Sequence, residues 1–215
     1  MRLRDFADSA LRLLFPPRCV LCGREGDLVC ESCRRSLPPR LDPDAIPKLN
    51  GIRAARAVWP YEGNVREIVR HYKYNGLRSL APVLALEMGD VLHEWGPATD
   101  VIVHVPVHPA RLRERGFDQS GLLARELSQM TGLVAISALV RLRETGVQAR
   151  AMSAAERAAN VRGAFHVPNP AQIRRANVLL IDDVLTTGAT LTEAARALRH
   201  GGANNVYALT FAHET

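Results

Sequence analysis

The chain has 215 residues and a mass of 23.6 kDa, a length that suits one or two domains. Hydrophobic residues make up 47% of it and charged residues 23%, which excludes a wholly disordered chain and allows a sizeable core. Its apolar runs are too short to span a bilayer, and no unbroken apolar stretch of a signal peptide follows Met1. We therefore expect a cytoplasmic protein without membrane insertion.

The net charge is +6, and 26 of the 28 basic residues are arginine, because Lys48 and Lys73 are the only lysines. The planar guanidinium group binds phosphate through two parallel hydrogen bonds. A codon bias toward arginine in a GC-rich genome explains the excess equally well. The sign of the charge favours anionic partners.

The first 50 residues differ in composition from the rest of the chain. Apolar side chains at helical spacing predict an amphipathic helix over residues 3–14, which ends at Pro16. All four cysteines lie within residues 18–35. Residues 36–50 are rich in proline and charge, which is typical of a linker.

From residue 51 onward, short apolar runs alternate with helical patterns. We expect strands at 55–61, 101–105, 164–167, 178–181 and 206–210, and helices at 64–74, 119–130 and 191–200. Strands that are apolar on both faces and alternate with helices indicate a parallel sheet of the α/β class. We predict two units: a helix and finger in residues 1–40, and an α/β domain in residues 51–215.

The cysteines form two pairs, Cys19-x2-Cys22 and Cys30-x2-Cys33, separated by seven residues. Two such pairs supply the four soft ligands of a tetrahedral zinc site. A pair of disulfides or a redox motif is the alternative, but disulfides are rare in cytosolic chains, and redox work does not need two matched pairs. We therefore expect one closed, structural Zn²⁺ site.

The most informative stretch runs from Val178 to Thr190. An apolar strand delivers two adjacent carboxylates, Asp182 and Asp183, to its carboxyl end, where ligands of open α/β sheets bind. A turn of small residues then opens a helix, whose backbone N–H groups can hold a phosphate. Gly188 would let that backbone approach the ligand closely. The alternative, in which Asp and Thr only cap the helix, does not explain the whole pattern.

This stretch closely resembles the phosphoribosyl-pyrophosphate (PRPP) loop of type I phosphoribosyltransferases. The resemblance implies that Asp182 and Asp183 are catalytic-site residues that hold the ribose 2′- and 3′-hydroxyls. It also implies a 5′-phosphate cradle made of Thr186, Thr187, Gly188, Ala189 and Thr190. Mg²⁺ would arrive with the diphosphate and be held mostly by ligand oxygens and water.

Further motifs resemble one branch of this fold, the ComF family, in which a four-cysteine finger precedes a phosphoribosyltransferase domain. The motifs span nearly the whole chain in the expected order. They are Phe15-Pro16-Pro17-Arg18-Cys19, His71-Tyr72-Lys73-Tyr74-Asn75-Gly76, Val105-Pro106-Val107-His108, Arg115-Gly116-Phe117-Asp118-Gln119-Ser120, Thr145-x2-Gln148 and Arg157-x2-Asn160-Val161-x-Gly163-Ala164-Phe165. Asp118 departs from the family, which usually has Asn there; it can still cap the following helix.

In transferases of this fold, the loop after the first core strand holds the pyrophosphate. The resemblance therefore implies a diphosphate site at Val107, His108 and Arg115, where backbone donors and cations are available. A solvated helix face is the alternative for the arginines. Residues 141–162 resemble the mobile hood that closes over the diphosphate, and a charged surface loop is the alternative there. For Lys73, a phosphate or nucleic-acid contact competes with a lysine that reaches past the core to solvent.

Two functions follow from the resemblance. The first is an enzyme that transfers the phosphoribosyl group of PRPP to an acceptor, which the sequence does not identify. The second is a non-catalytic protein that senses PRPP or handles single-stranded DNA during natural competence, on the cytoplasmic side of the DNA uptake machinery and beside helicase-type competence proteins. An aromatic content of 5% supplies few platforms for base stacking.

Overall fold

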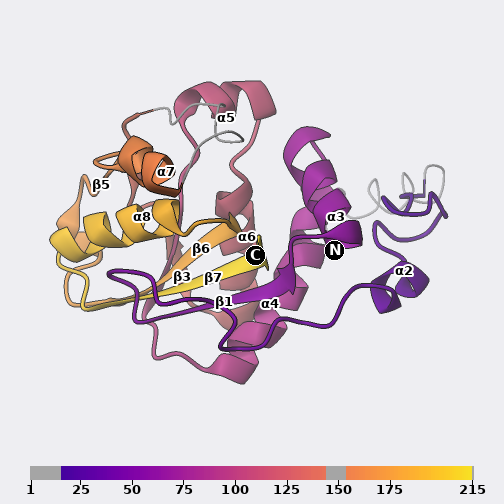
Figure 1. Ribbon diagram of the computed structural model, residues 1–215, viewed down its shortest axis with the longest axis horizontal. Coiled ribbons are helices and arrows are strands. Elements are labelled where there is room, and N and C mark those ends of the chain that lie inside the picture. The colour runs from indigo at the N-terminus through magenta and orange to yellow at the C-terminus, as the bar shows by residue number, and fades with distance from the viewer. Residues whose placement is uncertain (1–15, 144–153, 215) are drawn as a thin grey trace, which may run out of the picture.

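The computed structural model describes residues 16–143 and 154–214, so the helix expected over 3–14 lies outside the described residues. Within them, five parallel strands form one sheet in the order β1-β7-β6-β2-β3 (Figure 1). These strands are β1 (Ala54–Pro60), β2 (Val101–His104), β3 (Val134–Ile136), β6 (Asn177–Leu185) and β7 (Asn205–His213). The predicted α/β fold with a parallel sheet is confirmed.

Helices cover both faces of this sheet. The helices that the structure describes are α2 (Glu31–Arg35), α3 (Gly63–Tyr74), α4 (Ala81–Trp95), α5 (Pro109–Arg115), α6 (Gln119–Thr131), α7 (Ala154–Val161) and α8 (Ala189–His200), with short 3-10 turns η1 (Arg78–Leu80) and η3 (Pro170–Gln172). Helix α4 and the short strand β3 have no counterpart among the predicted elements.

The central strand β6 shows why its sequence reads as a continuous apolar run. Leu179 and Ile181 join the cluster of apolar side chains shared with α4 and α6. Val178 and Leu180 join a second cluster, shared with α8. Successive strand residues point to opposite faces, so a strand covered on both faces must be apolar at every position.

The predicted strand at 164–167 is present but lies outside the main sheet. Strand β5 (Phe165–His166) pairs antiparallel with β4 (Val140–Arg141) in a separate two-stranded ribbon. Phe165 is buried against the α8 cluster, and the Arg141 guanidinium lies 5.3 Å from the centre of its ring. The β-branched and aromatic composition indicated a strand, but it did not indicate its partner.

The segment predicted as a linker is packed along the domain. The backbone N–H of Leu41 donates to the Val58 carbonyl at 2.9 Å, and Arg56 donates from Nη1 to the Pro43 carbonyl at 2.6 Å. Ile46 and Leu49 pack against the cluster beneath α8. The segment rich in proline and charge is therefore irregular in structure, and it packs against the edge strand β1.

None of the described helices combines the length and the apolar character that crossing a membrane requires.

Candidate phosphate-binding pocket and zinc site

The two acidic residues lie within β6, because the strand continues past Ile181 to Leu185. Asp182 pairs in register with Thr210 of the neighbouring strand β7, and the residues from Thr186 onward turn toward α8. The carboxylates therefore stand on the rigid end of a central strand, and the phosphate cradle predicted for residues 186–190 follows immediately.

Helix α8 begins at Ala189, and Gly188 precedes it in a left-handed conformation with φ of 75°. A glycine adopts this conformation without the steric cost that a side chain brings. A Cβ atom at Gly188 would also collide with Cδ2 of Leu49, which reaches the turn from the packed segment. The turn is thus supported from behind by the chain that joins the finger to the domain.

Asp183 is paired with a cation from a distant helix. Nζ of Lys73, the penultimate residue of α3, lies 2.8 Å from Oδ1 of Asp183, and the two side chains are 18% and 9% exposed. Burial lowers the pKa of Lys73, but the adjacent Asp183 carboxylate more than offsets this, so the pKa lies above its usual value. Lys73 therefore neutralises one of two adjacent negative charges.

Asp182 is held by helix α6. Oγ of Ser120 donates to Oδ1 of Asp182 at 2.8 Å, and the backbone N–H of Asp183 donates to the same oxygen at 2.9 Å. Burial and the neighbouring charge of Asp183 raise the pKa of Asp182 to about 7, against the hydrogen bond from Ser120 and the charge of Lys73. This carboxyl therefore changes charge near neutral pH.

These side chains line one cavity of about 360 Å³. Of the residues predicted to hold PRPP, the cavity is lined by Asp182, Asp183, Thr186, Thr187, Ala189 and Thr190, and Gly188 is not among its lining residues. The cations Lys73, Arg111 and Arg115 also line it. Carboxylates, hydroxyls at a helix N-terminus and cations around one hollow suit a sugar that carries phosphates.

The predicted diphosphate site is only partly assembled around this cavity. Val107 and Arg115 line it, and Arg115 donates from Nη1 to Oε1 of Gln119 at 3.3 Å. His108 is not among the lining residues; its Nδ1 caps α5 by accepting from the backbone N–H of Ala110 at 3.3 Å. Arg111, the third residue of α5, also lines the cavity.

Asp118 organises the loops beside the cavity. Its Oδ1 accepts from the backbone N–H of Gly121 at 2.8 Å, which confirms that it caps α6. Its Oδ2 accepts from the backbone N–H of Val107 at 3.3 Å and lies 3.5 Å from Nε2 of His104. Burial raises the pKa of Asp118, but His104 and these hydrogen bonds outweigh it and hold the pKa below its usual value.

Residues from both ends of the segment predicted as a hood line the cavity. Arg141 comes from β4, and Asn160 and Val161 come from α7. The intervening residues 144–153 lie outside the described part of the chain. The hood assignment stays a prediction.

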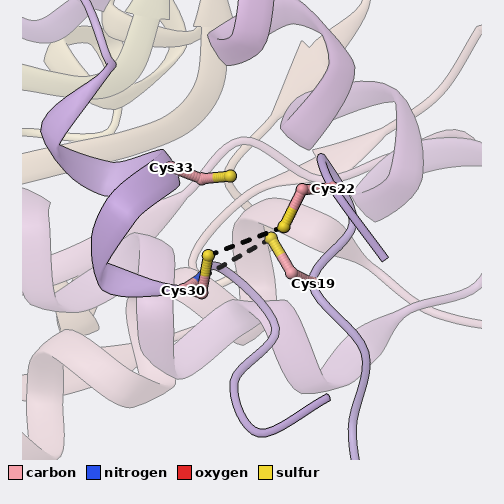
Figure 2. Close-up of side chains that lie close together, drawn as sticks. All are labelled: Cys19, Cys22, Cys30 and Cys33. Atoms are coloured by element: carbon pink, nitrogen blue, oxygen red, sulfur yellow. Dashed lines mark hydrogen bonds between the residues drawn. The ribbon is translucent and has the colours of Figure 1, made fainter. Parts of the chain in front are cut away.

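The four cysteines converge, as Figure 2 shows, with Cys19 and Cys22 in one knuckle and Cys30 and Cys33 around the start of α2. Their Sγ atoms all lie within 4.8 Å of one another, and none of the four forms a disulfide. Sγ of Cys22 lies 3.7 Å from Sγ of Cys30. Four thiolates at 2.3 Å from a zinc ion would be about 3.8 Å apart, so the spacing fits the metal.

The environment of Cys19 favours the ionised thiol that zinc needs, whereas hydrogen bonding with Cys22 and burial raise the pKa of Cys33 to about 12. Burial raises the pKa of Cys19, but backbone N–H groups of Cys30, Cys22 and Leu21 stabilise the thiolate and lower the pKa to about 6. The N–H of Cys30 lies 3.5 Å from Sγ of Cys19. The residues therefore fit a closed, structural Zn²⁺ centre.

The finger docks on helix α4 through a buried carboxylate. Glu87, whose side chain is 8% exposed, lies 2.5 Å from Nη2 of Arg34 and 2.8 Å from Nη2 of Arg40. Apolar residues of the finger pack against the same cluster as α4; they are Val20, Leu21, Leu28, Val29 and Leu37. The finger that holds the zinc site is thus packed against the α/β domain.

Comparison with known proteins agrees with both halves of this description. The family described as "Double zinc ribbon domain" matches residues 10–45, and that described as "Phosphoribosyl transferase domain" matches residues 112–214. The chain is 31% identical over 201 residues to "DNA utilization protein YhgH" of Salmonella typhi, with 91% of this chain and 82% of that protein covered. It is 29% identical to "Competence protein F" of Haemophilus influenzae, with 88% and 82% covered.

The chain belongs to the ComF family. A third member, "Competence protein ComFC" of Bacillus subtilis, is 28% identical over 90% of this chain and 76% of that protein. Among solved structures, a glutamine PRPP amidotransferase from B. subtilis, complexed with ADP and GMP, is 22% identical with a TM-score of 0.40. The match covers 63% of this chain and 26% of that enzyme.

Sequence reasoning assigned no role to Ser120 and left Lys73 undecided. Both lie in motifs that the ComF resemblance singled out, at residues 71–76 and 115–120. Each proves to hold one of the two adjacent carboxylates. Their place in a motif was the available signal, but their partners depend on how α3 and α6 pack against β6.

Proposed function

We propose that this ComF-family protein binds PRPP with Mg²⁺ and transfers or recognises its phosphoribosyl group. The observation that supports this best is the cavity in which the end of β6, the turn into α8 and the cations of α3 and α5 come together.

The ribose would be read by the acidic pair. Oδ1 of Asp182 already accepts two hydrogen bonds, so its Oδ2 is the oxygen that we assign to a ribose hydroxyl. Oδ1 of Asp183 is engaged by Lys73, and its second oxygen is assigned to the other hydroxyl. Residues 186–190, at the N-terminus of α8, would hold the 5′-phosphate by backbone N–H groups and hydroxyls.

The diphosphate would face the cations. Arg115 and Arg111 line the cavity, together with Val107. Phosphate oxygens and water are hard ligands that Mg²⁺ prefers, so the ion would arrive with the diphosphate and be held mostly by it. The ion would offset charge on the diphosphate as it leaves.

In a transfer reaction, the bond from the ribose C1 atom to the diphosphate oxygen breaks, and a bond from C1 to the acceptor forms. The protein needs no nucleophile for this step. Its contribution would be to hold the diphosphate, place the sugar and keep water away from the electron-poor C1 atom.

A second candidate is a non-catalytic role in handling single-stranded DNA. The names of the relatives, "DNA utilization protein" and "Competence protein", favour it, as do the arginines around the cavity. Partners of the helicase type, which the sequence suggested by resemblance, stay a prediction. The two candidates share a site for a sugar phosphate and differ in whether C1 reacts.

Calorimetric titration of PRPP with Mg²⁺ tests the binding site. Thr190→Val removes a hydroxyl that lines the cavity, and Thr192→Val makes the same change two residues later in α8, outside it. We expect Thr190→Val or Asp182→Asn to weaken PRPP by about tenfold or more, since a hydrogen bond to a charged group contributes roughly 1.5–3 kcal/mol. Thr192→Val should bind as the wild type does. Equal affinities in all three variants would refute the site.

Release of pyrophosphate from PRPP across a panel of nucleobases separates transfer from recognition. Release that requires a particular base and is lost in Asp182→Asn supports an enzyme. Tight PRPP binding without release under any condition supports recognition alone.

A further inference from the structure

Two tyrosines flank Lys73 in α3, and they have opposite environments. Tyr72 is fully buried, and its hydroxyl donates to the Gln119 carbonyl at 2.8 Å. Tyr74, the last residue of the helix, is 66% exposed, the largest exposed fraction among the large hydrophobic residues that the structure describes. Packing of the core therefore accounts for Tyr72 and leaves Tyr74 without a role.

Tyr74 stands at the rim of the cavity described above, beside Lys73. The guanidinium carbon of Arg115 lies 5.2 Å from the centre of its ring, which is a cation–π arrangement. Arg115 is itself held by Gln119. The ring is thus positioned by a residue that also lines the cavity.

A second hollow of about 450 Å³ adjoins the ring and is lined by Tyr74, Glu67, Arg70, His71 and Asn75. Its polar groups can pair with the edges of a flat heterocycle or with a phosphate. Because Tyr74 lines both hollows, a ligand that extends from the first one toward the second comes within reach of the ring.

The size of the first cavity indicates where a base would lie. At about 360 Å³ it is near the lower end of the roughly 300–1,000 Å³ typical of small-molecule sites. A sugar with its phosphates uses this space, so a base attached to the same sugar extends to the rim. An exposed aromatic ring with cations around it suits a flat base carried on a phosphorylated sugar.

We propose that Tyr74 is a stacking platform for the base of a nucleotide unit whose sugar phosphate lies in the cavity between β6 and α5. The inference rests on the proposed function, because it takes the cavity to hold a sugar phosphate, and it adds the class of ligand. The nucleotide unit can come from a free nucleotide or from a single strand, since both present the same base and sugar phosphate.

The test compares ligands that differ only in the base. Affinities for ribose 5-phosphate and for adenosine 5′-monophosphate are measured with the wild type, Tyr74→Phe and Tyr74→Leu. Leucine keeps an apolar side chain at the exposed position and removes the ring, and melting curves verify that each variant folds. We expect Tyr74→Leu to lose roughly five- to hundredfold in affinity for the nucleotide, with ribose 5-phosphate unchanged and Tyr74→Phe close to the wild type.

A single-stranded oligothymidylate and an abasic strand of equal length identify the source. A loss with Tyr74→Leu for the oligothymidylate but not for the abasic strand assigns the platform to single strands. A loss confined to the free nucleotide assigns it to the mononucleotide. In Tyr74→Trp, quenching of the added tryptophan by either ligand reports stacking directly.

Two failures are distinguishable. If the wild type binds ribose 5-phosphate but Tyr74→Leu binds every base-containing ligand as well as the wild type does, the platform is wrong and the proposed function stands. If the wild type binds neither ribose 5-phosphate nor PRPP, the proposed function fails, and this inference fails with it.

Discussion

The proposed role of Asp182 and its surroundings make opposite demands on its charge. A ribose hydroxyl is bound best by an ionised carboxylate, yet burial and the adjacent Asp183 raise the pKa of Asp182 to about 7. Ser120 and the backbone N–H of Asp183 supply hydrogen bonds that offset part of this cost. If the proposed ligand binds there, a hydroxyl that donates to Asp182 would favour the ionised form and lower this pKa.

The raised pKa predicts that stability depends on pH. An unfolded aspartate has a pKa of about 3.9, so between pH 4 and 7 the folded protein binds the extra proton. The stability that this residue contributes is therefore full below about pH 4. It falls as pH rises toward 7 and is lost above that value. A tenfold change in proton affinity corresponds to about 1.4 kcal/mol.

Urea unfolding of the wild type and Asp182→Asn at pH 5 and pH 8 measures this effect. From pH 8 to pH 5 the wild type should gain about 2–3 kcal/mol relative to the variant. The comparison with asparagine cancels the titration of groups that do not interact with Asp182. A difference that does not change with pH would show that Asp182 titrates normally.

Helix α3 and strand β6 are joined at their ends by the Lys73–Asp183 ion pair. Both side chains are largely buried, so removing either one breaks a buried ion pair and leaves the other charge in a poorly solvated position. Lys73→Met and Asp183→Asn should each destabilise the protein by about 3 kcal/mol.

The double variant should cost clearly less than the sum of the two, because neither charge is then left alone. Denaturant unfolding of the four proteins in this cycle gives the coupling energy. Lys48→Met, at the other lysine of the chain, is the control and should change stability little. Simple additivity would show that the ion pair does not couple the two elements.

At the level of elements, local patterns predicted much of the fold. Strand β6 and the turn into α8 are encoded within 13 consecutive residues, 178–190, so the sequence indicated them and their acids directly. Helix α4 was missed because its apolar residues include Leu84, Met88 and Leu92 but also Leu86 and Val91, so they do not form one clear stripe. Val91 packs against the same cluster as the buried residues of α4, whereas Leu86 is exposed.

The contacts that complete the candidate site were not predictable, because they join segments far apart in the chain. Ser120 and Asp182 are 62 positions apart, and Leu49 reaches Gly188 from the supposed linker. His108 shows the converse, because a plausible motif residue proves to cap a helix. A local pattern indicates the type of residue that a site needs. Tertiary packing determines which residues of that type lie at the site.

At the scale of the whole molecule, the finger and the α/β domain share one core. The division into residues 1–40 and 51–215 stays a prediction, but the contacts of Glu87 and the apolar finger residues cross it. The guanidinium of Arg40 also lies 5.9 Å from the ring centre of Trp59 in β1. Loss of zinc should therefore lower the stability of the α/β domain as well as that of the finger.

Removal of the metal tests this coupling. Protein purified without chelator should contain about one zinc ion per chain, since four paired thiolates bind one ion. Both tryptophans, Trp59 and Trp95, lie outside the finger, so melting followed by tryptophan fluorescence reports on the α/β domain. A loss of about 2 kcal/mol from the shared core would lower the melting temperature by about 4–8 °C.

Cys22→Ser/Cys33→Ser, which removes one ligand from each pair, should melt at the lower temperature from the start and show no further change with chelator. Glu87→Gln is a second test of the coupling between the finger and the α/β domain. It keeps zinc and weakens the docking of Arg34 and Arg40, so it should make the fluorescence transition less sensitive to chelator. An unchanged transition in metal-free wild type would mean that the finger folds and unfolds independently of the domain on which it lies.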